Sequence, residues 1–369
     1  MDSVNDLLFD EAIRHQINLN KYSTSLVHRM IAVLNRADAR LFAELAFRLQ
    51  DMTAANFTSE RLESMLGSVR AMNAQAYAQL ERDLRQELRD FVDYEAAYQH
   101  KALFTATPVQ VHIAAVSAEQ VYTAALARPF QGVLLKGVLA DLEAGRAKKI
   151  RQAIAQGFVE NKTTDQIIRE LRGTRAKGFA DGLMEAPRRD IEAVTRTALG
   201  HMARFTQDQT VEANLDLIKA LAWSATLDLK TSPICRIRDK KTYTPGAHKP
   251  IGHSLPWLGG PGAAHWRCRS HATYVLKSNK ELGIDLPEIE TRGGTRASMD
   301  GQVPKDTNFA QWLEKQSYAR QIEVLGPTRA ALMKDGKLPL ERMYDSKGQT
   351  LTLAQMRESD AGAFKRAGL

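Results

Sequence analysis

Residues 223–274 read WSATLDLKTSPICRIRDKKTYTPGAHKPIGHSLPWLGGPGAAHWRCRSHATY, and this stretch concentrates the side chains with specific chemistry. It contains both cysteines of the chain, Cys235 and Cys268, and three of the four tryptophans. The segment 243–262 is rich in Gly and Pro, which predicts a long ordered loop. Alternating and β-branched residues at 217–227 and 271–277 predict a strand on each side. From Ala222 to Tyr274 we therefore expect a motif of strand, turn, large loop and returning strand.

The spacing of histidine and cysteine in this motif favours a metal site. His265 and Cys268 are separated by two residues, which lets both side chains reach one ion, and Cys235 lies upstream as a third ligand. Donors of this borderline-soft kind favour zinc over magnesium or calcium. His271 continues the spacing and is the candidate fourth ligand. Other candidates for the fourth position are His253, Asp239 and water. We expect a structural role for the zinc, because a long Gly/Pro loop has few other ways to offset its ordering entropy.

Two other interpretations of the same residues stay open. The cysteines can be small buried apolar residues that close the loop, with His265 hydrogen-bonded to the backbone. Alternatively, Cys235 can be a nucleophile, with His265 as its base and Asp228 or Asp239 as the orienting acid. The segment HWRCRSH lacks the clustered carboxylates of a divalent-metal nuclease. Phosphate-binding patterns of the GxxxxGK[ST] or GxGxxG type are absent from the sequence.

Charge and composition narrow the class of protein. The 51 Lys and Arg residues against 43 Asp and Glu residues give a net charge of +8, spread along the chain and not collected in one run. This balance is compatible with contact to a polyanion, and a solvated surface of mixed charge explains it equally well. The first residues carry acidic groups and no apolar signal region, and no run of about 18 apolar residues occurs. We therefore expect a soluble protein made in a cytoplasm, with no membrane partner and with reduced thiols.

Apolar periodicity predicts a mainly α fold of the α+β class. Apolar residues recur every three or four positions over 26–49 and 62–91, which predicts two long helices packed as an antiparallel hairpin. Thr163 and Gln166 form a capping-box pattern before a helix that Gly173 ends, and a further helix is expected over 188–213. The expected divisions are an N-terminal helical region (1–105), a central domain with the Cys/His motif (106–277), an extended or mobile arm (278–305) and a small C-terminal helical module (306–369).

The helix over 188–213 contributes two further candidates, Arg196 and Thr197. Arg196 is either a buried residue that ties this helix to Asp228 of the motif or an exposed arginine, and Thr197 is correspondingly a motif residue or an ordinary mid-helix threonine. The tryptophans of the motif are expected to anchor the core and the loop and not to stack on bases.

Three segments resemble a known family. These are RTALGHMARF (196–205), WSATLDLKTSPICRIRDKKTY (223–243) and PGAAHWRCRS (261–270). Together they resemble the head morphogenesis domain of the Mu F-like minor head proteins of tailed bacteriophages, a family that includes the SPP1-type minor capsid proteins. The C-terminal region (301–357) and the N-terminal helices are also similar to this family. The matching motif positions are Arg196, Thr197, Trp223, Asp228, Ser232, Cys235, Asp239, His265, Cys268 and Arg269.

The resemblance implies a virion protein and not an enzyme. Such a protein is present in few copies inside the phage head near the portal vertex, after assembly in the cytoplasm of the bacterial host. It assists head morphogenesis, and its implied partners are the portal protein, the scaffold or major capsid protein, and packaged double-stranded DNA. The alternative functions are a zinc-dependent or Cys/His hydrolase or toxin-type enzyme, and a zinc-stabilised DNA-binding module.

Two departures from the family pattern affect the motif. Ser232 and Ser270 stand where some members have cysteine, which leaves Cys235, His265 and Cys268 as the matching metal-type positions. Lys240 stands where the pattern has glycine. The tight turn after the first cysteine must therefore form without the conformational freedom of glycine.

Overall fold

The computed structural model describes residues 4–50, 52, 58–107, 111–285, 287 and 294–369. The chain forms two compact units, each assembled from segments far apart in the sequence. The bundle unit comprises Lys21–Phe91 and Tyr122–Leu199, and the sheet unit comprises Met1–Asn20, Val92–Val121 and Gly200–Leu369. Residues of both units occur in α1 (Val4–Leu49), α2 (Ser59–Ala106), α3 (Ala118–Leu126) and α6 (Glu185–Ala213). The expected division of the chain at residues 105, 277 and 305 is not tested by these contacts and stays a prediction.

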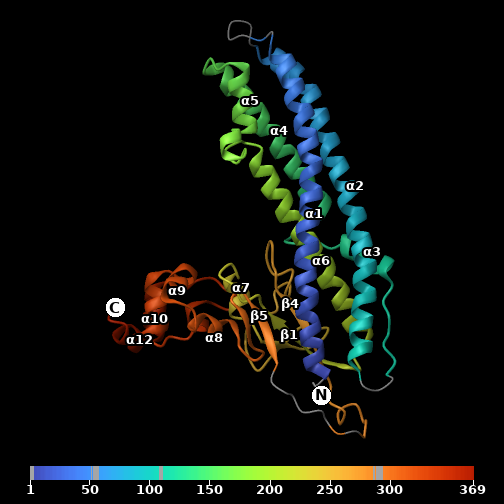
Figure 1. The fold of residues 1–369 in the computed structure, drawn as a ribbon, viewed down its shortest axis with the longest axis vertical. Helices are drawn as coiled ribbons and strands as arrows, with labels where there is room; N and C mark the ends of the chain where they lie inside the picture. Colours follow the sequence, from blue (N-terminus) through green and yellow to red (C-terminus); the bar gives the residue numbers. More distant parts are fainter. Residues whose placement is uncertain (1–3, 51, 53–57, 108–110, 286, 288–293) are drawn as a thin grey trace. The chain divides into compact units, whose positions relative to one another are not determined.

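The bundle unit confirms the mainly α prediction and the long N-terminal helices. Figure 1 shows α4 (Leu135–Val159), α5 (Thr164–Arg172) and the first half of α6 beside α1 and α2. Arg29 of α1 pairs with Glu87 of α2, with 2.6 Å between Nη2 and Oε2, as expected for antiparallel neighbours. The apolar positions predicted from the helical period lie inside the bundle. Its buried core includes Leu41, Leu45, Leu49, Leu62, Leu66, Val69, Ile150, Ile154, Phe158, Ile167 and Leu171.

Helix α5 begins and ends where its capping residues predict. The Thr163 hydroxyl accepts from the Gln166 N–H at 3.3 Å, and the Gln166 side chain accepts from the Thr163 N–H at 2.7 Å. This reciprocal pair satisfies two N–H groups that the first turn leaves without helical partners. Gly173 follows the last turn at φ 88°, a conformation that favours glycine, and η1 (Arg175–Lys177) comes next.

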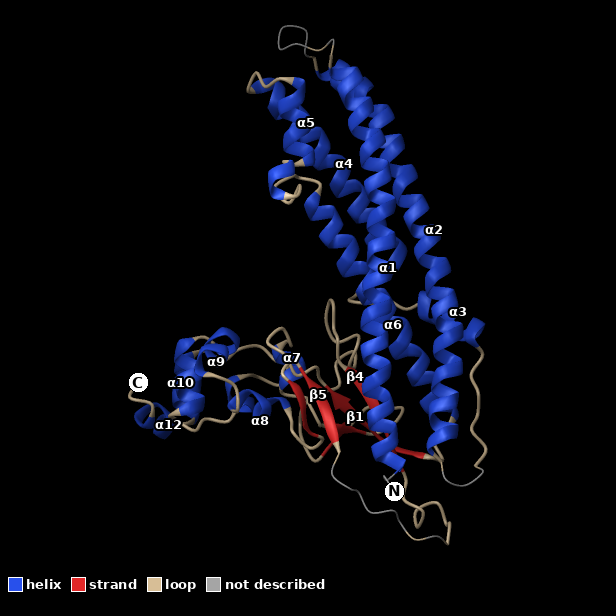
Figure 2. Ribbon diagram, in the orientation of Figure 1, coloured by secondary structure: helices blue, strands red, loops and turns tan. Residues whose placement is uncertain are grey.

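A four-stranded antiparallel sheet forms the centre of the sheet unit. The predicted strands on either side of the loop are confirmed as β1 (Ile218–Ser224) and β4 (His271–Leu276), with Leu221 opposite Tyr274. The loop between them was expected to lack regular structure, but it contains β2 (Thr242–Tyr243) and β3 (Pro250–Ile251). The strand order is β3-β2-β1-β4, drawn in red in Figure 2. One face packs against helix residues Leu8, Leu103 and Val211.

The arm expected at 278–305 contains a β-hairpin that its low apolar content did not predict. Strands β5 (Thr295–Ser298) and β6 (Gly301–Pro304) pair with each other, and Met299 N–H donates to the Leu227 carbonyl at 3.0 Å. Arg296 is 2% exposed, so a buried ionic group helps to attach the hairpin, and Val303 of β6 packs against a buried apolar cluster. Positions 286 and 288–293 of the expected arm lie outside the described residues.

The C-terminal segment forms short helices, as expected, and shares its core with the Cys/His motif. The elements are α8 (Phe309–Glu314), α9 (Tyr318–Leu325), α10 (Pro327–Lys334), η2 (Leu340–Met343), α11 (Leu353–Ser359) and α12 (Ala361–Arg366). Trp312, Met343 and Phe364 of this module lie in one buried cluster with Leu227 and Ile237 of the motif. Among the described residues, none of the helices combines the length and apolar character that crossing a lipid bilayer requires.

Candidate metal centre

A one-turn helix, α7 (Pro233–Arg236), positions the first cysteine of the motif. Pro233 is the first helical residue, where its fixed φ and missing N–H are tolerated. Ser232 is the N-cap residue, and the Cys235 N–H donates to its carbonyl at 3.0 Å. This turn holds the Cys235 side chain inside the sheet unit, where the residue is 2% exposed.

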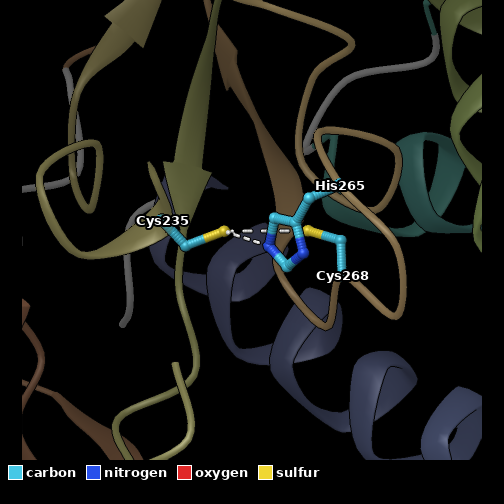
Figure 3. Close-up of side chains that lie close together, drawn as sticks. All are labelled: Cys235, His265 and Cys268. Atoms are coloured by element: carbon cyan, nitrogen blue, oxygen red, sulfur yellow. Dashed lines mark hydrogen bonds between the residues drawn. The ribbon is translucent and has the colours of Figure 1, made fainter. Parts of the chain in front are cut away.

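Cys235, His265 and Cys268 come together with their donor atoms facing one another (Figure 3). The two sulfurs are 3.7 Å apart, and 3.4 Å separates Cys235 Sγ from His265 Nε2. Tetrahedral zinc with Zn–S bonds of about 2.3 Å and a Zn–N bond of about 2.0 Å places two sulfurs about 3.8 Å apart and sulfur about 3.5 Å from nitrogen. Both separations in the cluster fit these edges, so the residues present fit a zinc ion.

The backbone fixes which nitrogen of His265 can bind a metal. Nδ1 lies 2.8 Å from the Trp266 carbonyl oxygen. A carbonyl only accepts, so Nδ1 carries the proton and the lone pair of the neutral ring is on Nε2. Nε2 faces Cys235, and it also lies 2.7 Å from the Ser232 hydroxyl oxygen. A hydrogen bond that orients the non-ligating nitrogen in this way is typical of metal-binding histidines.

The pKa values of the two thiols are shifted in opposite directions. Burial raises the pKa of Cys235, and the neighbouring Cys268 raises it further. The hydrogen bond from Cys235 lowers the pKa of Cys268 against the effect of its own burial. The Gly262 N–H donates to Cys268 Sγ at 3.3 Å. For His265, burial lowers the pKa, but the hydrogen bond to Cys268, the charge of Cys268 and the hydrogen bond to the Trp266 carbonyl together outweigh burial, and the net direction is upward. The cluster thus stabilises a thiolate at Cys268, the form that binds a metal.

The residues expected to supply a fourth ligand lie elsewhere. His271 on β4 is half-buried, its Nε2 atom is buried without a hydrogen-bond partner, and desolvation lowers its pKa to about 3. The His253 ring bonds the Thr242 carbonyl at 2.9 Å, and Asp239 pairs with Arg296. The structure therefore does not bring His271 to the cluster. As the first residue of a paired strand, its side-chain direction follows the pleat of the sheet and not the spacing from Cys268.

Asp228 is bound by Arg269, and Arg196, for which the sequence left two interpretations open, has partners on α6 and α1. Both guanidinium Nη atoms of Arg269 donate to the Asp228 carboxylate, one of them at 2.8 Å. Burial alone would raise the pKa of Asp228, but these bonds outweigh it and hold the pKa below its ordinary value. Arg196 instead pairs with Glu192 one turn earlier on α6, at 2.8 Å, and reaches Ser23 of α1 at 3.2 Å.

Asp239 joins the motif to the β5–β6 hairpin through Arg296. Nη1 of Arg296 donates to Asp239 Oδ2 at 2.8 Å, and Nη2 donates to the Ala225 carbonyl at 2.6 Å. Asp239 Oδ1 accepts from the Ala225 N–H at 2.7 Å. Lys240 follows at φ 68°, so the turn forms in the left-handed region that favours glycine, at a cost of about 1–2 kcal/mol. Burial, then the nearby Arg296, lower the pKa of Lys240 to about 7.

The remaining candidates of the motif have structural partners. The Thr197 hydroxyl donates to the Ala193 carbonyl at 2.7 Å, an ordinary bond for a threonine inside a helix. Trp223 is fully buried and packs edge-on against Trp257 with ring centroids 5.6 Å apart, as expected of a core anchor. Residue patterns did not single out Arg238 or Arg296. Arg238 is 0% exposed and donates to the Ile234 and Pro256 carbonyls, each at 2.9 Å.

Comparison with known proteins returns no relative. No protein-family model matches the chain, and no curated protein or solved structure is significantly similar to it.

Proposed function

We propose that this chain is a minor head protein of a tailed bacteriophage or prophage that acts in head morphogenesis at the portal vertex. The proposal rests on the resemblance of its motif to the Mu F-like proteins. The observation that supports it most is the convergence of the motif residues 223–270 on one junction. In that junction Asp228 binds Arg269, Asp239 binds Arg296, and Cys235 faces His265 and Cys268.

The partners of these groups favour a structural role over a Cys/His hydrolase. The nucleophile–base–acid arrangement considered above would place Asp228 or Asp239 on the second nitrogen of His265. Here Nδ1 of His265 bonds a backbone carbonyl, and Asp228 and Asp239 are bound by arginines. Cys235, the proposed nucleophile, is also almost completely buried. Asp228 and Asp239 are thus each bound by an arginine from another segment of the chain. Such contacts hold segments of the fold together, as expected of a structural role.

We further infer that a zinc ion is bound by Cys235, His265 and Cys268 and has a structural role. When bound, the ion would supply Lewis-acid attraction that joins α7 to the loop before β4. The donor set, its sulfur–sulfur separation and the fixed tautomer of His265 support this inference. Because the ligands lie on two segments 30 or more positions apart in the sequence, the ion would stabilise the loop against opening.

The proposed partners are the portal protein, the scaffold or major capsid protein, and packaged DNA. The long amphipathic helices α1 and α2 are of the kind that docks on other proteins. The net charge of +8 is compatible with DNA contact. A zinc-stabilised DNA-binding module explains the charge as well, but it does not explain the similarity of the N-terminal and C-terminal regions to minor head proteins.

Mass spectrometry of phage heads tests the proposal. Procapsids and mature particles are purified from the bacterium that carries the gene, after induction, and their peptides are quantified against the major capsid protein. We expect peptides of this chain in both particles at a few copies per head. A strain with the gene deleted should give fewer infectious particles, and a plasmid copy should restore them. Absence of the chain from both particles, with normal titre after deletion, would refute the proposal.

A further inference from the structure

Ser232 uses its hydroxyl in a way that its position in the chain does not explain. It is the N-cap residue of α7, and a serine there ordinarily accepts a hydrogen bond from an N–H of the first helical turn. The Ser232 side chain makes no such bond. Its Oγ instead lies 2.7 Å from Nε2 of His265, one of the three donors of the Cys/His cluster. The capping stabilisation, typically about 1 kcal/mol, is thus given up for a contact with the cluster.

The direction of that contact follows from the protonation of the ring. Because Nδ1 of His265 donates to the Trp266 carbonyl, Nε2 can only accept in the neutral ring, and Ser232 donates the proton. The hydroxyl therefore lies on the lone pair that a metal ion would take. The Ser232 hydroxyl is thus in direct contact with one of the three donors of the cluster.

We propose that Ser232 is the fourth protein donor of the metal centre, completing Cys235, His265 and Cys268 through its Oγ. Without metal, the hydroxyl donates to Nε2. When bound, the ion would take the lone pair of Nε2, and the Ser232 side chain would rotate so that a lone pair of Oγ faces the ion. This inference rests on the zinc ion proposed above and does not depend on a role in phage heads.

A hydroxyl donor has consequences for affinity. A neutral oxygen is a weaker ligand for zinc than a thiolate, because thiolate carries charge and is the softer donor. The centre should therefore hold zinc less tightly than a site with three cysteines and one histidine. Replacing Ser232 by cysteine should convert the centre to a site with three cysteines and one histidine.

Cobalt substitution provides the test, because absorption from thiolate-to-cobalt charge transfer increases with the number of bound thiolates. The full chain is prepared metal-free under reducing conditions and titrated with Co²⁺, then with Zn²⁺ against a competing chelator. Ser232→Cys should raise the charge-transfer absorption about one and a half times, from two thiolates to three, and tighten zinc binding at least about tenfold. Ser232→Ala should weaken zinc binding about tenfold.

A matched control shows whether the effect of a third cysteine depends on its position in the cluster. Ser254 is exposed in the same loop, outside the cluster, and Ser254→Cys should leave the cobalt spectrum and zinc affinity unchanged. The proposal is overturned if Ser232→Cys gives the same spectrum as Ser254→Cys, if Ser232→Ala binds zinc as tightly as the unchanged chain, or if the unchanged chain binds neither metal. Absence of the chain from phage heads would leave these spectra unaltered, so the two failures are distinguishable.

Discussion

Replacement of Arg296 by methionine should destabilise the protein strongly, because it leaves a buried carboxylate without its partner. The Arg296 and Asp239 side chains are 2% and 0% exposed. Arg296 also donates to the carbonyls of Ala225 and Thr307, at 2.6 and 3.0 Å. Removing one partner of a buried ion pair typically costs about 3–5 kcal/mol. We expect Arg296→Met to lower the free energy of unfolding by that amount.

Two further variants test whether the lost free energy of unfolding comes from the unpaired buried carboxylate. In Arg296→Met/Asp239→Asn, no buried charge is left unpaired and the amide oxygen can still accept from the Ala225 N–H. The double variant should therefore recover about 2 kcal/mol relative to the sum of the single changes. The control is Arg320→Met, which breaks an ion pair with Asp300 whose side chains are 38% and 35% exposed. Its cost should stay below about 1 kcal/mol.

Urea unfolding followed by tryptophan fluorescence and circular dichroism gives the free energies. The unchanged chain, Arg296→Met, Asp239→Asn, the double variant and Arg320→Met are compared at pH 7 with the same metal content, so that the metal centre contributes equally. A loss for Arg296→Met that is within about 1 kcal/mol of the loss for Arg320→Met would refute the reasoning. It would mean that the hairpin is held by something other than this ion pair.

Further outcomes follow from the metal centre, the left-handed turn and the glycines. Purified under reducing conditions, the chain should carry about one zinc ion, and Cys268→Ser should lose it and melt at a lower temperature, by metal analysis and calorimetry. Because the pKa of Lys240 is lowered to about 7 in the folded state, the unfolded chain binds more protons between pH 7 and about 10.4. Stability should therefore rise with pH over that window, and more weakly in Lys240→Met, by urea midpoints. Gly200→Ala places a Cβ 2.5 Å from the Gly262 carbonyl oxygen and should cost about 1–3 kcal/mol. Gly145→Ala on α4 meets nothing within 4 Å and should gain about 0.5–1 kcal/mol.

The helical part of the fold was predictable because its signals are local. Leucines every three or four residues fix the buried face of a helix wherever the helix packs, and Thr163 with Gln166 marks a helix start through a bond spanning three residues. The β5–β6 hairpin was missed for the complementary reason. Its attachment depends on contacts between residues far apart in the sequence, such as Arg296 with Asp239 and Met299 with Leu227. Neither the period of a strand nor the composition of the segment records such contacts.

The candidate site divides in the same way. The spacing of His265 and Cys268, with Cys235 upstream, predicted one cluster, and the structure brings the three donors together. The choice of His271 as fourth ligand, and the link of Arg196 to Asp228 that was one of two interpretations, depended on which segments meet in the fold. Arg196 faces its own helix and α1, while Arg269, only one residue after Cys268, binds Asp228. Closeness to the motif in the sequence therefore did not identify which arginine binds Asp228.

By itself, the sequence determined the helices, the two strands around the loop and the set of side chains able to bind a metal, because these depend on residue type and on spacings of a few positions. Only the tertiary structure decided that Arg269 binds Asp228, that Arg296 binds Asp239, and that the Ser232 hydroxyl lies at Nε2 of His265. Each of these pairs is separated by more than 30 positions. Their meeting depends on how the Gly/Pro loop folds back across the sheet, and that path is set by packing around the whole unit.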